Sequence, residues 1–481
     1  MGQKALRYRG RLYLDGEWVD GPDRTTVTDL AAGGAFAEVA AAGEDQAERA
    51  LAAAESVKRP LRETTIPERV RWVEQIAAGI AERREELAEV IVREAGKPIS
   101  SARGEVESAA ERFRRAAEEI RAMKGEYRTG TTEGHEGWRA IVEHEPVGAV
   151  LCITPYNYPL ATTALQVAPA LAAGNAVVLK PASKTPISAA ILAEIIADTD
   201  VPDGAFNFVP GPSSAIGDYL AGDDRVNAIA MTGSSSAGEH VARESGMVEL
   251  HMELGGNAPA VVFEDADLES AASAAAKGSV KYAGQRCSAV SRVVAQSGVH
   301  DELVERIDRE LDDWTVGDLF DEDTDLGPLI SESQAEWVDE LVTDAVDRGA
   351  DLVRGGDYEE TAAGVFTYEP TLLADVPHDA RILHEEQFGP VAAVTSVEDE
   401  AEALALVDES DLALDASVFT NNHDRALRVA GSIDAGAVRI NGAPSHGLGD
   451  IPFGGNRASG IGREGLHETI KSFVRKKSIV L

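Results

Sequence analysis

Short apolar segments that alternate with helical ones are the feature that most constrains the fold of this chain. Residues 147–181 contain an apolar run, a turn, a helix expected to begin near Pro159, and a second apolar run, Ala176-Val177-Val178-Leu179-Lys180. This βαβ spacing predicts a parallel sheet, because parallel strands require a crossover connection and are buried on both faces. A further strand at 227–231 precedes a glycine turn and a helix. We therefore predict a dinucleotide-binding unit in this half of the chain.

The remaining segments predict a chain of several packed units, as expected for 481 residues. Residues 47–122 have helical periodicity, with breaks expected at Pro60, Pro67 and Gly96-Lys97-Pro98. Residues 126–146 predict a projecting hairpin that pairs with another subunit, and a second α/β unit follows Glu253 and continues to about Arg439.

The charge balance restricts the partners. With 45 Lys+Arg against 83 Asp+Glu, the formal net charge is −38, so nucleic acid and anionic membrane surfaces are not expected to bind. We expect a small-molecule substrate, and such an acidic surface favours a halophilic, high-salt host. The first residues lack an apolar signal core, which predicts a cytoplasmic location. Two cysteines, Cys152 and Cys287, provide neither a disulfide framework nor a metal site.

Cys287 is the candidate nucleophile. It lies in Gly284-Gln285-Arg286-Cys287-Ser288-Ala289, where small neighbours allow a carbonyl to approach the sulfur. Glu253, in Glu253-Leu254-Gly255-Gly256-Asn257, is the candidate base, because its apolar flanks indicate a partly desolvated carboxyl. Cys152, within an apolar run, is expected to be a buried structural residue.

Asn157 is a candidate oxyanion donor. It lies in Thr154-Pro155-Tyr156-Asn157-Tyr158-Pro159 at the end of a predicted strand, and its amide donates without changing protonation state. The alternative is an asparagine that only stabilises a turn.

Three short signals point to a nucleotide. Gly233 and Gly238 would allow close approach of phosphates and tight packing of the following helix, although the pattern is not a complete dinucleotide motif. Lys180 ends a predicted strand, and Ser183 follows without a nearby carboxylate. A carboxylate at this strand end would repel the 2′-phosphate on the adenosine ribose of NADP. Because none is present, Lys180 and Ser183 favour NADP, or the use of both cofactors, over strict NAD. An exposed lysine without a ligand is the alternative.

Taken together, seven motifs resemble those of the aldehyde dehydrogenase superfamily, in the family's order and over nearly the whole chain. They are Tyr156-Asn157-Tyr158-Pro159, Lys180-Pro181-Ala182-Ser183, Thr232-Gly233-Ser234, Glu253-Leu254-Gly255-Gly256-Asn257, Gly284-Gln285-Arg286-Cys287, Glu385-Glu386-Gln387-Phe388-Gly389-Pro390 and Pro452-Phe453-Gly454-Gly455.

The resemblance implies an α/β fold with three parts: a Rossmann-type cofactor domain (1–125 and 147–252), an α/β catalytic domain (253–440) and a small bridging β element (126–146 and 465–481). It also implies a homodimer or homotetramer.

The resemblance further implies that Cys287 attacks an aldehyde, that Asn157 and the Cys287 N–H hold the oxyanion, and that Glu253 activates water against a thioester. Glu386 would hold the nicotinamide ribose and Phe388 would pack near the ring. The expected cofactor contacts are Thr154, Lys180, Ser183, Gly233, Ser234, Gly238, Leu254, Glu386 and Phe388.

The expected substrate contacts are Tyr158, Arg286, Ser288 and His446. Tyr158 and Arg286 look like the non-phosphorylating glyceraldehyde-3-phosphate dehydrogenase branch, since arginine suits an anion. Some members of that branch carry arginine near the position of His446, so lactaldehyde and succinate semialdehyde also stay open as substrates. Arg286 could instead be a structural ion-pair partner.

Two alternative functions stay open. One is an acylating enzyme that uses coenzyme A, against which Glu253 argues, and the other is a non-catalytic structural or binding protein.

Overall fold

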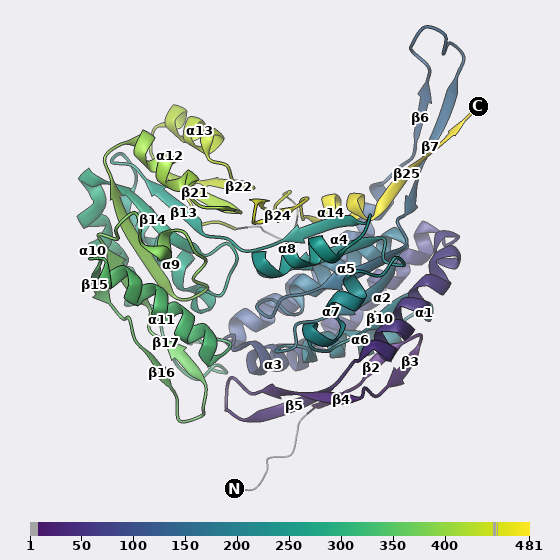
Figure 1. Cartoon of the computed structure of the whole chain (residues 1–481), viewed down its shortest axis with the longest axis horizontal. Coiled ribbons are helices and arrows are strands. Elements are labelled where there is room, and N and C mark those ends of the chain that lie inside the picture. The colour runs from purple at the N-terminus through teal and green to yellow at the C-terminus, as the bar shows by residue number, and fades with distance from the viewer. Residues whose placement is uncertain (1–7, 446–448, 450) are drawn as a thin grey trace.

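A computed structural model describes residues 8–445, 449 and 451–481. Two large sheets form the two halves of the molecule, and a β-hairpin with the C-terminal strand projects from one of them (Figure 1). The α/β class predicted from the apolar segments is confirmed.

The first sheet has eight strands in the order β24-β12-β11-β8-β9-β10-β2-β3. Its five central strands, β8 to β12, are mutually parallel, as the βαβ spacing predicts. The strands are β2 (Leu12–Leu14), β3 (Glu17–Val19), β8 (Ala149–Ile153), β9 (Ala176–Lys180), β10 (Phe206–Phe208), β11 (Ala228–Thr232), β12 (Glu249–Glu253) and β24 (Gly460–Ile461).

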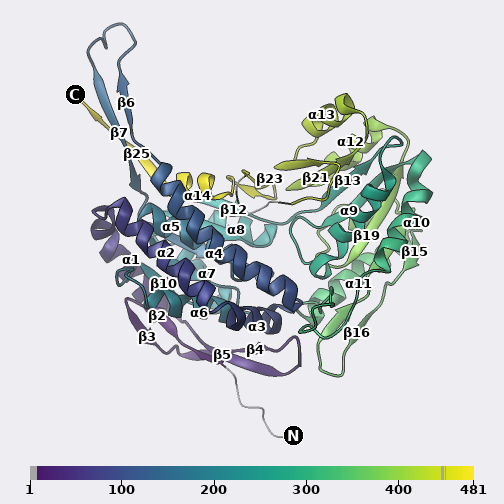
Figure 2. The same cartoon turned by 180° about the vertical axis from the view of Figure 1, so that it is seen from behind.

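Helices cover both faces of this sheet, because alternate residues of its strands point to opposite sides. In β8, Val150 and Cys152 pack into one core, while Ala149 and Leu151 pack into the other. The first core is covered by α2 (Ile66–Glu82), α3 (Arg84–Ala95), α4 (Ile99–Ala122), α5 (Ala161–Ala173), α6 (Ile187–Ala197) and α14 (Leu466–Ser472). The second is covered by α1 (Glu44–Arg62), α7 (Ser213–Ala221) and α8 (Ser235–Glu244). Figure 2 shows α2 and α4 side by side.

The helix breaks were predicted in part. Pro67 lies in the first turn of α2, after the capping residue Thr65, and Gly96 ends α3 in the left-handed conformation. The break at Pro60 is wrong, because α1 continues through it to Arg62. The proline lies in the last turn, where the loss of one hydrogen bond disturbs little of the helix.

The second sheet has seven strands in the order β15-β18-β19-β14-β13-β21-β22, parallel except for β15. The strands are β13 (Ala258–Val262), β14 (Val290–Gln296), β15 (Asp351–Arg354), β18 (Thr371–Ala374), β19 (Val391–Val397), β21 (Asp415–Phe419) and β22 (Ala437–Ile440). One face packs against α9 (Leu268–Val280) and α10 (His300–Leu311), and the other against α11 (Glu332–Asp347), α12 (Glu400–Asp408) and α13 (His423–Ser432).

A three-stranded antiparallel sheet, β25-β7-β6, forms the projection (Figure 1). It consists of β6 (Glu126–Thr129), β7 (Arg139–Pro146) and β25 (Val474–Val480). Tyr127, Trp138 and Val480, which carry apolar side chains, are 61%, 52% and 56% exposed. The remaining strands are β1 (Tyr8–Gly10), β4 (Asp23–Thr28), β5 (Ala35–Ala41), β16 (Tyr358–Glu360), β17 (Phe366–Tyr368), β20 (Leu412–Ala413) and β23 (Asn456–Arg457).

Within the described residues, none of the helices has both the length and the apolar character needed to cross a membrane.

Candidate active site

A cavity of about 1090 Å³ lies between the two halves of the molecule. One wall is formed where β8, β9, β11 and β12 end, at Thr154, Lys180, Thr232 and Glu253. The other half contributes Cys287, Gln334, Trp337, Glu386 and Phe388. Ligands of open α/β sheets bind at the carboxyl ends of parallel strands, so this cavity is the candidate active site.

The loop before Cys287 has a strained backbone. Tyr282 and Ala283 have φ angles of 58° and 49°, in the left-handed region that non-glycine residues avoid. The Tyr282 hydroxyl donates to the Ala95 carbonyl at 2.8 Å, and the Ile330 amide donates to Gln285 Oε1 at 2.9 Å. Such strain persists only where the surroundings determine the conformation, and it is common at functional sites.

The Glu253-Leu254-Gly255-Gly256 segment brings the two halves into contact. A Cβ atom at Gly256 would lie 2.2 Å from the Cys287 carbonyl oxygen, so only glycine allows this approach. Leu254 is buried, and its side chain packs on the backbone of Gly238 in α8. The motif therefore sets the position of Glu253 relative to Cys287.

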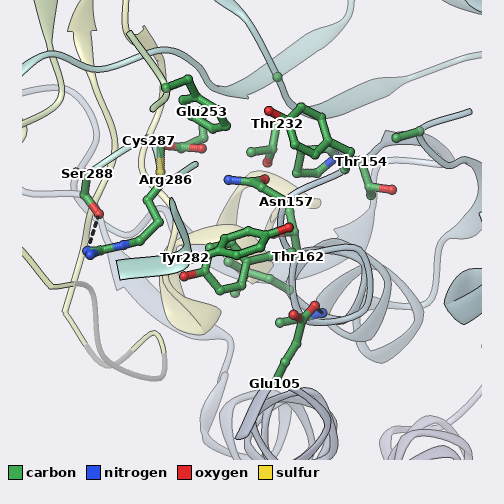
Figure 3. Close-up of a pocket in the computed structure, with 18 of the residues that line it drawn as sticks. Glu105, Thr154, Asn157, Thr162, Thr232, Glu253, Tyr282, Arg286, Cys287 and Ser288 are labelled. Carbon is green, nitrogen blue, oxygen red and sulfur yellow. Dashed lines mark hydrogen bonds between the residues drawn. The ribbon is translucent and has the colours of Figure 1, made fainter. Parts of the chain in front are cut away.

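The half-buried Cys287 thiol lies directly beside the buried Glu253 carboxyl, within hydrogen-bonding reach (Figure 3). Burial, followed by the charge of Glu464, raises the pKa of Glu253 well above its usual value. Burial and the neighbouring Glu253 carboxylate likewise raise the pKa of Cys287. Glu253 Oε1 has no hydrogen-bond partner within the described residues. A carboxyl with a raised pKa and a free oxygen is suited to accept a proton near neutral pH.

Asn157 lies between β8 and α5, with its side chain directed into the same cavity (Figure 3). It is buried, and its Nδ2 donates to the Gln285 carbonyl at 3.0 Å. This hydrogen bond fixes the amide beside the Cys287 loop. The structure therefore brings Cys287, Glu253 and Asn157 together, as their sequence motifs suggested.

Glu386 and Phe388 line the adjoining part of the cavity. Glu386 Oε1 accepts the Gly256 amide at 3.0 Å, and burial raises the pKa of Glu386 to about 7. The Phe388 ring meets Tyr156 edge to face, with centroids 5.9 Å apart. The buried Ser235 Oγ has no hydrogen-bond partner within the described residues. These polar groups beside an aromatic ring fit a ribose and a planar base.

A second region of the cavity is suited to the phosphate and adenosine end of a nucleotide. Gly233 and Ser234 line it at the N-terminus of α8, where Ser234 Oγ accepts the Ala237 amide at 3.4 Å. The buried Lys180 and the half-buried Ser183 lie beside Lys184 and Ser213. The buried Thr154 donates its amide to the Lys180 carbonyl at 3.2 Å. Burial lowers the pKa of Lys180 to about 8.

Tyr158, Arg286 and Ser288 line the opposite region. Arg286 Nη2 lies 3.5 Å from Ser288 Oγ, a weak contact at the limit of hydrogen bonding (Figure 3). His446 lies outside the described residues, while the neighbouring Ser445 lines the cavity.

Besides Lys184 in the cofactor region, five charged residues of the cavity were missed by the sequence analysis. They are Lys97, Glu105, Arg112, Lys281 and Glu464. The segment Gly96-Lys97-Pro98 was interpreted only as a helix break, and the other four have no motif around them. Three of the five are cations, which gather with Arg286 in a protein of net charge −38.

Residues 18–479 match the model of the Aldehyde dehydrogenase family. The 3-sulfolactaldehyde dehydrogenase of Priestia megaterium is 36% identical over 98% of this chain and 97% of its own length. The succinate-semialdehyde dehydrogenase [NADP(+)] of Escherichia coli is 35% identical over 98% of this chain and 97% of its own.

A solved structure is similar to the same extent. The crystal structure of NADP-dependent glyceraldehyde-3-phosphate dehydrogenase from Bacillus halodurans, complexed with NADP, has a TM-score of 0.95 and 35% identity, over 98% of this chain and 99% of that one. The chain belongs to the aldehyde dehydrogenase family, and it is an NAD(P)-dependent aldehyde dehydrogenase.

Proposed function

We propose that this enzyme oxidises a small aldehyde with an anionic group to the carboxylate, through a thioester on Cys287. The observation that carries the proposal is the convergence of Cys287, Asn157 and Glu253 at one point, next to a cluster of cations. Glyceraldehyde 3-phosphate, oxidised without phosphorylation, is the first candidate. Succinate semialdehyde is the second, and lactaldehyde tests whether the anion is needed.

The first half of the reaction would occur at the Cys287 sulfur. The Cys287 thiol would lose its proton to water, and the resulting thiolate would add to the aldehyde carbon and place negative charge on the carbonyl oxygen. The Asn157 amide and the Cys287 backbone N–H would hold this oxyanion, and one such donor typically contributes about 3 kcal/mol to the barrier. Glu386 and Phe388 would hold a nicotinamide cofactor, which would supply the hydride acceptor for the same carbon, and the thioester would then remain on Cys287.

The second half would depend on Glu253. Its raised pKa and free oxygen suit it to take a proton from a water molecule as that water attacks the thioester carbon. The C–S bond would then break, the second proton of that water would return to the Cys287 sulfur, and the carboxylate would leave. Water therefore replaces coenzyme A as acyl acceptor, which distinguishes this reaction from that of an acylating enzyme.

The cation cluster supports an anionic substrate. We define it as Lys97, Arg112, Lys281 and Arg286, all of which line the cavity. Lys97 is paired with Glu105, and Arg112 Nη1 donates to the Ala161 carbonyl at 2.6 Å. Arg286 and Lys281 therefore have more donors left for a ligand. The similar proteins named above act on aldehydes with a sulfonate, a carboxylate and a phosphate, which all bear negative charge.

The cofactor region supports NADP over NAD. Lys180, Lys184, Ser183 and Ser213 supply cations and hydroxyl groups, and no acid lines this region among the described residues. A carboxylate there would hold the two ribose hydroxyls of NAD and repel a 2′-phosphate.

We also propose the domain division expected from the sequence, with 1–125 and 147–252 binding the cofactor and 253–440 carrying the nucleophile. Residues 126–146 and 465–481 would pair with a second copy. The exposed apolar side chains on β6, β7 and β25 support this role. A homodimer or homotetramer then follows.

A panel of aldehydes tests the substrate. Purified enzyme is assayed with glyceraldehyde 3-phosphate, succinate semialdehyde and lactaldehyde, each with NADP and NAD, and with the variant Arg286→Gln. We expect kcat/KM to be highest for an anionic aldehyde with NADP, and Arg286→Gln to remove that preference. The control Arg114→Gln changes an exposed arginine of α4 and should change nothing. Equal rates with lactaldehyde would contradict the anionic-substrate proposal.

A further inference from the structure

The segment between η3 (Arg381–Leu383) and β19 is irregular, although two of its side chains line the cavity. Residues 384–390 lie outside the helices and strands, and they include Glu386 and Phe388. The φ angle of Phe388 is 50°, in the left-handed region that a non-glycine residue keeps only where its surroundings determine the conformation. Contacts other than a strand ladder must therefore hold this segment in place.

Side chains of α11 bind three consecutive carbonyl oxygens of this segment. Trp337 Nε1 donates to the Glu386 carbonyl at 3.0 Å. Gln334 Nε2 donates to the carbonyls of Gln387 and Phe388, at 3.0 and 3.2 Å. The two donors are three residues apart and lie on one face of the helix. Backbone carbonyls outside a ladder need such donors, so α11 sets the backbone conformation here.

The helix also packs closely against the segment and fixes the indole. A Cβ atom at Gly389 would lie 2.4 Å from Val338 Cγ2, so the two backbones approach each other closely. The guanidinium carbon of Arg381 lies 5.3 Å from the centre of the Trp337 ring, and Arg381 forms an ion pair with Glu340 of α11. These contacts restrict rotation of the indole and keep its N–H on the carbonyl.

The position of the Glu386 carboxyl depends on the same backbone. Its Oε1 accepts the Gly256 amide, and a Cβ atom at Gly255 would lie 2.7 Å from its Oε2. The carboxyl therefore fits closely against the segment that follows Glu253. A shift of the Glu386 backbone would move this carboxyl and, two residues further on, the ring of Phe388.

We propose that Trp337 and Gln334 are positioning residues for the nicotinamide end of the cofactor, because they hold the carbonyls of residues 386–388. This inference rests on the proposed assignment of Glu386 to the nicotinamide ribose and of Phe388 to the ring. The adenosine end is proposed to bind at Lys180, in the other half of the molecule. Loss of a donor in α11 should therefore weaken binding of the whole cofactor and spare a ligand that lacks the nicotinamide.

The test compares two ligands by calorimetric titration. One is NADP, and the other is adenosine 2′,5′-bisphosphate, which has the adenosine and the 2′-phosphate but no nicotinamide. Trp337→Phe removes the indole N–H and keeps an aromatic ring, and we expect it to raise the Kd for NADP about fivefold, the effect of one typical hydrogen bond. Gln334→Met loses two hydrogen bonds and should raise it further. The Kd for the bisphosphate should not change in either variant.

A second measurement reports on the nicotinamide ring itself. The fluorescence anisotropy of bound NADPH should fall in both variants, because a displaced Phe388 leaves the ring freer to move. Trp314→Phe is the matched control, since Trp314 is also half-buried but packs on a core outside the cavity. It should leave both Kd values and the anisotropy as they are in the wild type.

Two results would overturn the positioning role of α11. One is an equal rise in Kd for both ligands, and the other is an unchanged NADP affinity and NADPH anisotropy in both variants. Glu386→Ala separates this role from the proposed function. If that variant binds NADP as tightly as the wild type, the assignment of Glu386 to the ribose fails. Weak binding by Glu386→Ala beside normal binding by the α11 variants would overturn the positioning role alone.

Discussion

The ammonium of Lys97 forms a buried ion pair with the carboxylate of Glu105 and lies 3.5 Å above the centre of the Tyr158 ring. Glu105 Oε1 also accepts the amides of Leu160 and Ala161, at 3.0 and 3.1 Å. The pair therefore joins the start of α4 to the loop that carries Asn157. It stabilises the fold and fixes one wall of the active site with the same contacts.

Removal of the Glu105 carboxylate should destabilise the protein strongly. Glu105→Ala leaves the Lys97 ammonium buried without its partner, so we expect the free energy of unfolding to fall by about 3–5 kcal/mol. Glu107→Ala, on the same helix, breaks the exposed contact with Arg84 and should cost less than about 1 kcal/mol. Urea denaturation followed by circular dichroism measures both. Equal effects of the two substitutions would contradict the structural role of the pair.

NADP binding should depend on the charge of Lys180. Because burial lowers its pKa to about 8, the charge is present below pH 8 and is lost as the pH rises through that value. We expect the Kd for NADP to increase between pH 7 and 9 more than the Kd for NAD. Lys180→Met should remove the difference, whereas Lys471→Met, in α14, should retain it. Calorimetric titration checks this, and identical pH dependence for both cofactors would argue against a 2′-phosphate contact.

Glu253→Gln should separate the two half-reactions. We expect acylation to proceed and to give a burst of one reduced cofactor per site, followed by turnover at least about 10²-fold slower than wild type. Since the pKa of Glu253 is raised, the wild-type rate of thioester hydrolysis should fall as the pH drops through that raised value. The variant should lack this dependence. Stopped-flow absorbance shows both effects, and normal steady-state turnover in the variant would remove Glu253 from the mechanism.

Salt should stabilise the protein. The net charge of −38 produces repulsion within the folded chain, which salt screens over about 3 Å at 1 M. We expect the thermal midpoint to rise between 0.1 and 2 M KCl. A midpoint that is highest at low salt would contradict the halophilic interpretation.

The sequence was informative where the chemistry lies in a local motif. Glu253 ends β12 and Asn157 follows β8, whereas Cys287 lies in the loop before β14, and all three line one cavity. Arg112 and Glu464 could not be found in this way. Arg112 lies in a helix that also carries Arg114 and Arg115, so its pattern does not distinguish the arginine that lines the cavity from its neighbours. Glu464 reaches the cavity only because β24 pairs with β12.

The most direct test of the account is the covalent state of Cys287. Glu253→Gln is mixed with NADP and an excess of the aldehyde that performs best in the panel, quenched in acid, digested and analysed by mass spectrometry. We expect the acyl mass on the peptide that contains Cys287 and none on the peptide that contains Cys152, which is buried. Cofactor reduction with no acyl group on Cys287, or sustained oxidation by Cys287→Ala, would contradict the thioester mechanism.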